Sequence, residues 1–135
     1  MRALSVKQPW AELIAAGKKK IEYRTWSVDL RGEVLIVASK SRNDDEVRAR
    51  RLDPAALLYG KAMCVVDLVK VTGEPGDYEW HLKNPRRVAP VDVTGYASLY
   101  TVPDERIRFV KSKGAAAKAR GGGAKKKAVK KAASR

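Results

Sequence analysis

The chain has 135 residues and a formal net charge of +14, because 29 lysine and arginine residues outnumber 15 acidic ones. That length suits one domain of ordinary size, since domains typically contain roughly 100 to 150 residues. The longest apolar runs, 34–38 and 62–66, are far shorter than the roughly 20 residues that span a bilayer, so we expect no transmembrane helix. The N-terminus lacks the apolar core of a signal peptide, which favours a cytoplasmic protein with no membrane partner.

The first expected elements are a strand and a short helix. Residues 3–6 predict the strand, and Pro9 suits the first turn of a helix because its missing amide has no helical partner there. Trp10 and Ile14 then fall on one helical face, and Gly17 is a natural left-handed stop.

A second strand is expected over 20–26, where side chains alternate between two faces. Glu22, Arg24 and Trp26 share one face, and Tyr23 lies on the other. This alternation is typical of a half-buried strand.

The middle of the chain predicts two central strands joined through short helices. β-branched residues favour strands over 33–38 and 61–71, the second long enough to bend or bulge. Between them, Asn43 can cap a helix that runs to about Leu52, and residues 53–54 begin another short helix.

The single cysteine, Cys64, lies in an apolar run of the second central strand. One thiol cannot form an internal disulfide, and with only His81 beside it there is no plausible ligand set for zinc. We therefore expect a buried thiol, no metal site and no cofactor.

After a turn at 73–76, residues 80–91 and 97–102 are expected to be strand or loop. Asn84-Pro85 and residues 94–95 are turn signals. Short strands dominate, so the expected fold class is α+β, with a small barrel or strongly bent sheet and short helices at its ends.

Residues 111–135 form a tail of different composition. They contain ten Lys or Arg and no acidic residue, so they carry +10, while the 19 basic and 15 acidic residues of 1–110 carry +4. The tail has almost no apolar surface to offset an ordering cost of roughly 1 to 2 kcal/mol per residue, so we expect disorder. The tail either keeps the protein in solution without binding a partner or binds phosphate. The expected phosphate-binding residues are Lys118, Arg120, Lys125, Lys126, Lys127, Lys130 and Lys131.

The densest polar cluster, GKKKIEYR (17–24), fits the pattern GxKxxExR. Glu22 and Arg24 should project from the same face of their strand, and Lys19 at the strand entrance can converge with them. A carboxylate held between cations stays ionised, and the cations remain available to a phosphate or a base carbonyl. The alternative is a surface ion-pair ladder worth only about 0 to 1 kcal/mol.

Two stretches, LSVKQPWAELI (4–14) and GKKKIEYRTW (17–26), closely resemble the ASCH (activating signal cointegrator homology) domain. The resemblance covers residues 1 to about 104 and does not extend to the tail. It implies a PUA-like β-barrel with flanking short helices over 1–110, and a cleft into which the GxKxxExR residues point. Three further positions also match the ASCH pattern: Arg31-Gly32, the single glycine Gly60, and the stretch NPRR (84–87).

The resemblance also implies binding of RNA or DNA, with some members hydrolysing modified nucleosides or cutting RNA. In the amidohydrolase members that act on acetylated cytidine, it places a catalytic lysine at Lys19 and a nucleophilic threonine at the position of Glu22. That hydroxyl is missing here, so Glu22 would serve only as a general base for water, with Lys19 as electrostatic partner. Asp67 is either a second carboxylate or a solvated strand residue.

Aromatic side chains would supply the stacking surface of a nucleotide site, since unpaired bases stack on them for roughly 1 to 3 kcal/mol each. Most of the aromatic residues are expected in the core, and Trp26 is the preferred ligand contact. His81 has no evident partner and is interpreted as a surface or turn residue. The candidate ligand-binding residues are Gln8, Trp10, Lys19, Glu22, Arg24, Trp26 and Ser27.

These features favour a nucleic-acid-binding module, with RNA ahead of DNA as its partner. The cleft would accept a nucleotide or an unpaired base, and the tail would hold surrounding phosphates. Two alternatives remain open: a hydrolase that acts on a modified nucleoside or on RNA with Lys19 and Glu22 in the same cleft, and a protein-binding adaptor.

Overall fold

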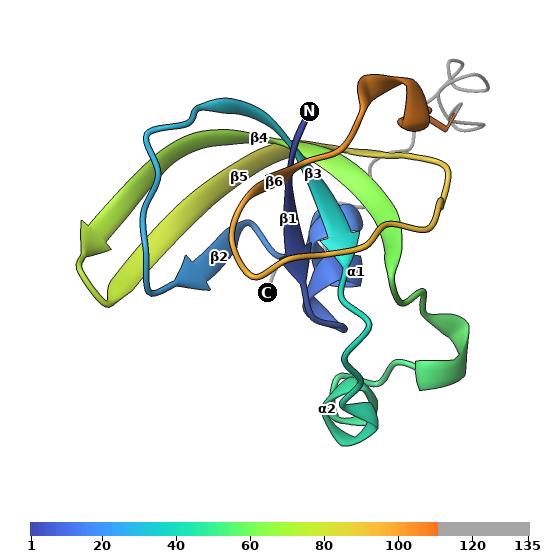
Figure 1. The fold of residues 1–135 in the computed structure, drawn as a ribbon. Coiled ribbons are helices and arrows are strands. Elements are labelled where there is room, and N and C mark those ends of the chain that lie inside the picture. The colour runs from blue at the N-terminus through green and yellow to red at the C-terminus, as the bar shows by residue number, and fades with distance from the viewer. Residues whose placement is uncertain (111–135) are drawn as a thin grey trace, which may run out of the picture.

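The computed structural model describes residues 1–110, and the expected phosphate-binding tail lies outside the described residues. The described part folds into strands and a few short helices (Figure 1). In chain order these are β1 (Arg2–Val6), α1 (Trp10–Ala15), β2 (Ile21–Arg24), β3 (Gly32–Ala38), α2 (Asp44–Ala49), η1 (Pro54–Ala56), β4 (Lys61–Glu74), β5 (Asp77–Arg87), β6 (Tyr100–Thr101) and η2 (Asp104–Arg106).

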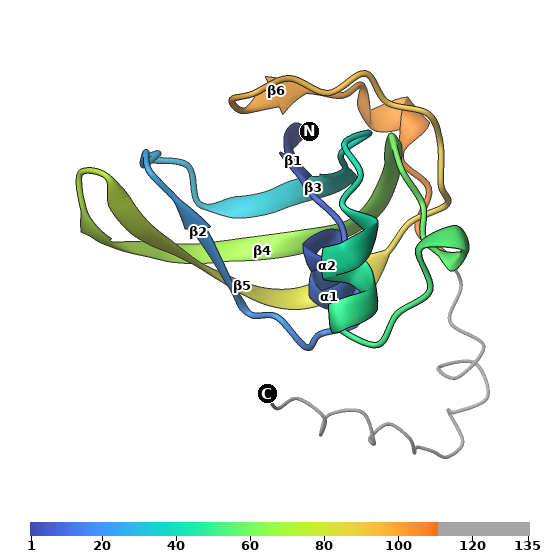
Figure 2. The ribbon, with the colours of Figure 1, turned by 90° about the horizontal axis from the view of Figure 1, so that it is seen from below.

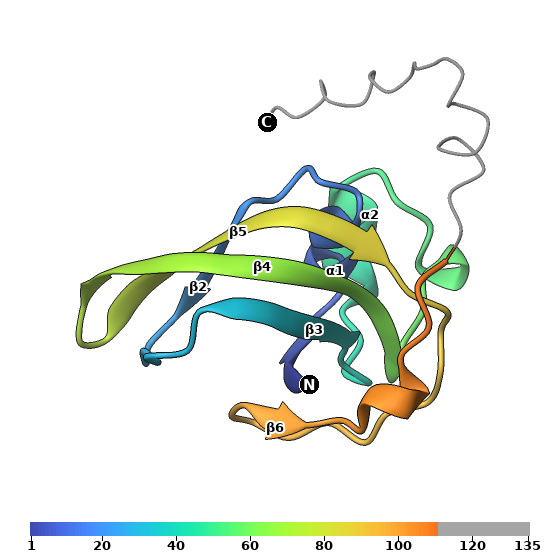
Figure 3. The ribbon, with the colours of Figure 1, turned by 90° about the horizontal axis from the view of Figure 1, so that it is seen from above.

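The strands form one six-stranded sheet in the order β2-β5-β4-β3-β1-β6. β1 pairs with β3 in parallel, and the other ladders are antiparallel. Figure 3 shows this order from β5 across β4 and β3 to β6. The mixed sheet with few short helices confirms the expected α+β class and is consistent with a PUA-like fold, although the backbone ladders end at β2 and β6 and do not show the closed barrel that the resemblance implied.

The sheet is strongly curved and arches over α1 (Figure 1). Register shifts in β4 explain part of the curvature, because each bulge adds a residue on one strand and increases the local twist. One core fills the concave side, where Ala11 and Ile14 of α1 pack against β3, β4 and the buried Trp80. A second core lies around Leu35 and Val65, whose side chains alternate onto the other face of the sheet.

The helices begin where the sequence predicted. Asn43 caps α2 by accepting a hydrogen bond from the Glu46 amide, as expected, but α2 ends at Ala49 rather than at about Leu52. The chain leaves the helix because Arg51 adopts a φ of 62°, outside the right-handed helical region. Figures 2 and 3 show α1 and α2 at the same end of the sheet. None of the described helices is long and apolar enough to cross a membrane.

The Asn84-Pro85 turn expected from the sequence is wrong, because both residues lie inside β5. They occupy a bulge, where the β4 pairing steps from Val65–Arg86 to Asp67–Lys83. Proline is tolerated there because bulges and strand edges do not need every backbone amide as a donor. The φ of 57° at Asn84 is one that asparagine adopts more readily than most residues.

The second strand is shorter than expected, Ile21–Arg24 instead of 20–26, and its polar face is the buried one. Glu22 is buried, whereas Tyr23 is 58% exposed. β2 pairs along one side with β5 and is an edge strand of the sheet. Glu22 and Arg24 on its inward face line a cleft.

Candidate functional site

Four segments that are distant in the sequence surround one open cleft of about 870 Å³. They are 5–7 at the end of β1, 22–26 along and after β2, 37–41 at the end of β3, and 93–97 before β6. The curvature of the sheet brings these segments together, since β2 and β1 are not neighbours in the strand order. The cleft thus lies where the sheet comes closest to closing.

Glu22 is the only charged residue among 1–110 that is buried, with 7% of its surface exposed. Arg24 Nε donates a hydrogen bond to Glu22 Oε2 at 2.9 Å. Glu22 Oε1 lies 3.8 Å from Lys19 Nζ and receives no hydrogen bond from any of the described residues. A carboxylate in this position is a hydrogen-bond acceptor with unused capacity at the edge of the cleft.

Arg24 links two strands that the backbone ladder leaves apart. Its Nη2 donates to the carbonyl oxygen of Ser5 at 2.8 Å, so the guanidinium connects β2 with β1. Its Nη1 makes no hydrogen bond within 1–110. The fixed fork of the guanidinium therefore orients Glu22 and keeps the Nη1 amino group free for a ligand.

Lys19 completes the charged cluster, as the GxKxxExR pattern predicted. Its Nζ donates to the Ile21 carbonyl at 2.5 Å. Burial lowers the pKa of Lys19; the Glu22 carboxylate opposes this effect, and the nearby Arg24 adds to it. The cluster is partly buried and is therefore not the exposed ion-pair ladder considered above.

Two tryptophans line the cleft, and each packs against another side chain. Trp26 packs edge-on against the buried Trp80, with ring centroids 4.9 Å apart, and Trp80 Nε1 donates to the Trp26 carbonyl at 3.2 Å. Trp10 packs under the guanidinium of Arg50, 4.4 Å from its ring centroid. Both rings are half-buried and line the cleft, so they are rigid surfaces on which a base can stack.

The wall opposite β2 contains residues that were not recognised as site residues from the sequence. Tyr96 is 62% exposed and packs edge-on against Tyr100, whose hydroxyl is 2.7 Å from Ser5 Oγ. A Cβ at Gly95 would come within 2.4 Å of Ser5 Oγ, so a larger residue there would displace the Ser5 hydroxyl from its contact with Tyr100. The only sequence signal was the turn dipeptide 94–95, which marks a loop but not its position in space.

Three of the seven predicted ligand residues do not line the cleft: Gln8, Ser27 and Lys19, of which only Lys19 adjoins it, through its ion pair with Glu22. Gln8 is 2% exposed, and both ends of its amide are used, since it donates to the Leu58 carbonyl and accepts from the Glu12 amide. Ser27 is exposed and does not line the cleft. The structure thus brings together Trp10, Lys19, Glu22, Arg24 and Trp26, but not Gln8 or Ser27.

Asp67 and His81 also lie away from the cleft. Asp67 is paired with Arg86 at 2.6 Å, which matches the solvated-strand interpretation. His81 Nε2 lies 2.9 Å from the Thr72 hydroxyl on the neighbouring strand. Within 1–110, no group of three or more His, Cys, Asp and Glu side chains is placed to hold a metal ion.

The family model of the ASCH domain matches residues 4–99, and no curated protein sequence matches the chain. The crystal structure of ASCH from Zymomonas mobilis is similar at a TM-score of 0.55 and 12% sequence identity, covering 77% of this chain and 88% of that one. A tyrosine-to-phenylalanine mutant of the same protein gives a TM-score of 0.55 at 12% identity, covering 77% of this chain and 91% of that one.

These likenesses to solved structures concern the fold, because the sequence identity is low. The family model extends over most of the described residues, from the end of β1 to the segment before β6. It also spans every residue that the cleft brings together. The chain therefore belongs to the ASCH domain family, whose PUA-like fold is associated with RNA binding.

Proposed function

We propose that this protein binds single-stranded RNA by taking one unpaired base into the cleft between β2 and the 93–97 loop. The observation that carries the proposal is the buried Glu22 carboxylate, whose Oε1 has no hydrogen-bond donor among the described residues. Oε1 is ion-paired with Lys19 at 3.8 Å but accepts no hydrogen bond from the described residues, so it is open to a ligand N–H, and a hydrogen bond to a charged group is stronger than one to a neutral group. The Watson–Crick edge of a base supplies such a donor.

A free amino group of Arg24 belongs to the same site. Arg24 Nη1 makes no hydrogen bond within 1–110, and Arg24 lines the cleft together with Glu22, so the site presents both a donor and an acceptor. Each nucleobase carries N–H groups and carbonyl or ring-nitrogen acceptors on its edge, so the pair can receive a base without dictating which one. Trp26 and Trp10 supply the stacking faces.

Charge at the cleft mouth favours a polyanion. Lys7, Arg24 and Lys40 line the cleft and outnumber its two acidic residues, Glu22 and Asp77. Phosphates that flank a bound base would meet these cations, and such contacts displace counterions. A basic rim is not what a protein-binding adaptor with an apolar groove would present, so this alternative has no support from the cleft.

The test is a binding titration of the full chain with labelled single-stranded RNA of about ten nucleotides, which exceeds the smallest sites of single-strand binders. The titration is carried out at raised salt, because salt weakens the electrostatic contribution of the tail to the affinity. Trp26→Ala should lower the affinity about 5- to 100-fold, because base stacking is worth roughly 1 to 3 kcal/mol. Phe109→Ala is the matched control, since Phe109 is 51% exposed and does not line the cleft.

Equal affinities for wild type, Trp26→Ala and Phe109→Ala would contradict the cleft as the base site. Glu22→Gln should also weaken binding, because it removes the charge that Arg24 and Lys19 surround. Single-stranded DNA of the same sequence tests the preference for RNA, which would depend on contacts to the 2′-hydroxyl. A thermal melt of each variant separates loss of binding from loss of folding.

A hydrolase is the second candidate, favoured by Lys19. Its pKa is lowered by burial, and its Nζ lies 3.8 Å from the Glu22 carboxylate in a cleft, an arrangement found at catalytic sites as well as in structural ion pairs. Glu22 would take a proton from water and Lys19 would stabilise developing negative charge. Incubation with acetylated nucleosides and with single-stranded RNA tests this activity. Absence of product, or product formation unchanged by Glu22→Gln, would eliminate it.

A further inference from the structure

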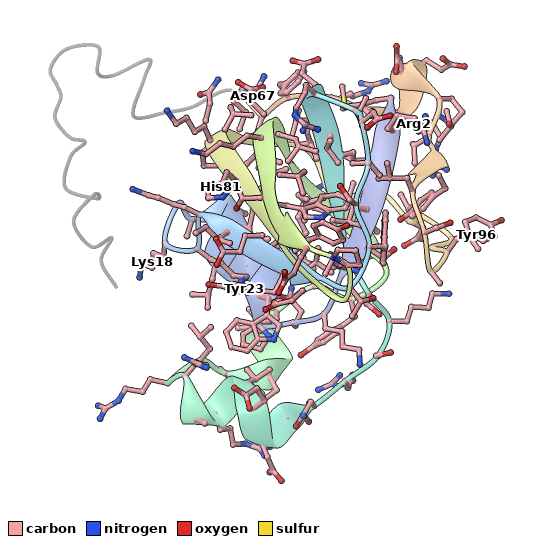
Figure 4. The ribbon with its side chains drawn as sticks, turned by 90° about the vertical axis from the view of Figure 1, so that its left-hand side faces the viewer. Arg2, Lys18, Tyr23, Asp67, His81 and Tyr96 are labelled. Carbon is pink, nitrogen blue, oxygen red and sulfur yellow. The ribbon has the colours of Figure 1, made fainter. Side chains whose placement is uncertain are left out.

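A second cavity, of about 950 Å³, lies beside the start of β2 and is separate from the cleft. The end of α1, residues 66–70 of β4 and residues 81–85 of β5 form its walls. Figure 4 shows His81, which lines this cavity, on the opposite side of the view from Tyr96 of the cleft. We refer to this cavity as the lysine pocket, after the side chains that line it: Lys19, Lys20, Lys70 and Lys83.

The lysine pocket has a strongly one-sided charge. Of the described residues that line it, none is acidic. Lys20, Lys70 and Lys83 are exposed, and none of them forms an ion pair within 1–110. The carboxylates at its border are already engaged, because Glu22 is paired with Arg24 and Asp67 with Arg86.

The floor of the lysine pocket is apolar. Ile14 and Leu82 are buried beneath it, and Val69, which is 41% exposed, lines it together with Pro85. Unpaired cations around an apolar floor match a ligand that has both negative charge and flat, weakly polar surface. A nucleotide has this composition, with phosphates for the lysines and a ribose and base for the floor.

Lys19 connects the lysine pocket with the cleft. It lines the lysine pocket, and its Nζ is 3.8 Å from Glu22 Oε1, which lines the cleft. Ile21 and Glu22, adjacent residues of β2, belong to the lysine pocket and the cleft respectively. A chain that leaves the cleft across β2 therefore meets the lysine pocket next.

We propose that the lysine pocket is a second RNA subsite, which holds the nucleotide adjacent to the base in the cleft, so that the RNA strand crosses the edge strand β2 at Lys19. This inference rests on the proposed RNA binding of the cleft. It adds the path that the RNA takes from the cleft across β2. It also gives a role to three lysines outside the fixed positions of the GxKxxExR pattern: Lys20, Lys70 and Lys83.

The experiment compares two full-length variants that lose the same charge. The test variant replaces Lys20, Lys70 and Lys83 with glutamine. The control variant makes the same replacement at exposed cations that line neither cavity: Arg2, Arg48 and Arg108. Both are titrated with single-stranded RNA of about ten nucleotides and with one mononucleotide, over a range of KCl concentrations.

The test variant should bind the mononucleotide like wild type but the oligonucleotide more weakly. Its plot of log affinity against log salt should become shallower by up to about 1.4, since the nucleotide in the pocket is flanked by two phosphates and each neutralised phosphate of a single strand contributes about 0.7. The control variant should change the slope by less than half of that. Equal slopes in the test and control variants would overturn the proposal, even where Trp26→Ala confirms binding in the cleft.

His81 gives an independent readout, because it is the only histidine of the chain and lines the lysine pocket. Its imidazole NMR signals should shift on addition of the oligonucleotide but not of the mononucleotide. Unmoved signals at saturation would also overturn the proposal. A poly-glutamate peptide that binds with the same dependence on the three lysines and shifts the same signals would instead assign the pocket to an acidic protein segment. If wild type binds no RNA, the proposed function and this inference fail together.

Discussion

Gln8 illustrates how a single buried polar side chain supports the cleft without lining it. Its amide donates to the Leu58 carbonyl at 2.8 Å and accepts from the Glu12 amide at 2.9 Å. It thereby fastens the start of α1 to the segment that precedes β4. The sequence analysis placed Gln8 among the candidate ligand-binding residues, but the structure uses both polar ends of its amide internally.

Gln8→Ala should lower the free energy of unfolding by about 2 kcal/mol or more, because each buried group left without a partner costs roughly 1 to 3 kcal/mol. Urea denaturation followed by circular dichroism measures the change. Lys7→Ala is the adjacent control, since Lys7 is exposed and its replacement should stay within about 0.5 kcal/mol of wild type. A Gln8→Ala protein as stable as Lys7→Ala would show that the two hydrogen bonds contribute little.

Cys64 is buried, as expected, and burial raises the pKa of its thiol to about 12. The reactive thiolate is therefore scarce at pH 8, so a thiol reagent should label the folded protein far more slowly than the protein unfolded in guanidinium. Above a pH of about 9, the unfolded thiol ionises while the folded one stays protonated up to about 12, so this group's contribution to stability is lost across that window. Labelling at equal rates in both states would contradict this account.

At the scale of elements, the long β4–β5 hairpin depends on the chemistry of its turn. Pro75-Gly76 joins the strands, and Gly76 has a φ of 93°, as a type II turn requires at its third position. Gly73 has a φ of 112°, and a Cβ there would lie 2.3 Å from the Asp77 carbonyl oxygen. The proline and glycines predicted a turn at 73–76, and the structure has it at Pro75-Gly76, with residues 73 and 74 still paired in β4.

Alanine substitutions at Gly73 and Gly76 should show how much stability is lost to steric clash and how much to backbone strain. Gly76→Ala meets no atom within 4 Å and should cost about 1 to 2 kcal/mol for the left-handed backbone alone. Gly73→Ala adds a collision with backbone and should cost more than Gly76→Ala in the same urea denaturation. Equal losses of stability would mean that the hairpin shifts to accommodate the new methyl group.

At the scale of the whole molecule, charge is distributed unequally between two parts of the chain. Residues 1–110 carry +4 and residues 111–135 carry +10, so most of the net charge lies outside the described residues. Within residues 1–110, the lysine pocket has a one-sided positive lining of four lysines and no acidic residue. We therefore expect the tail to contribute affinity for any polyanion, and the domain to contribute selectivity.

Glutamine replacement of the tail lysines should make RNA binding less sensitive to salt, without changing the relative affinities for different bases. The slope of log affinity against log salt should fall by up to about 3.5, at about 0.7 for each phosphate neutralised on a single strand. Fluorescence anisotropy over a KCl series measures it, with arginine at the same positions as the charge-preserving control. A slope unchanged in the glutamine variant would remove the tail from RNA binding. The positions are Lys125, Lys126, Lys127, Lys130 and Lys131.

The sequence by itself determined the family, the α+β class, most strand and helix starts, and the convergence of Lys19, Glu22 and Arg24. These features depend on local signals, namely side-chain alternation, caps, turn residues and a short motif. Only the tertiary structure decided that the polar face of β2 points inward, that residues 93–97 form the opposite wall, and that Gln8 is internal. Each of these depends on how a curved sheet brings distant segments together, and no local pattern encodes that approach.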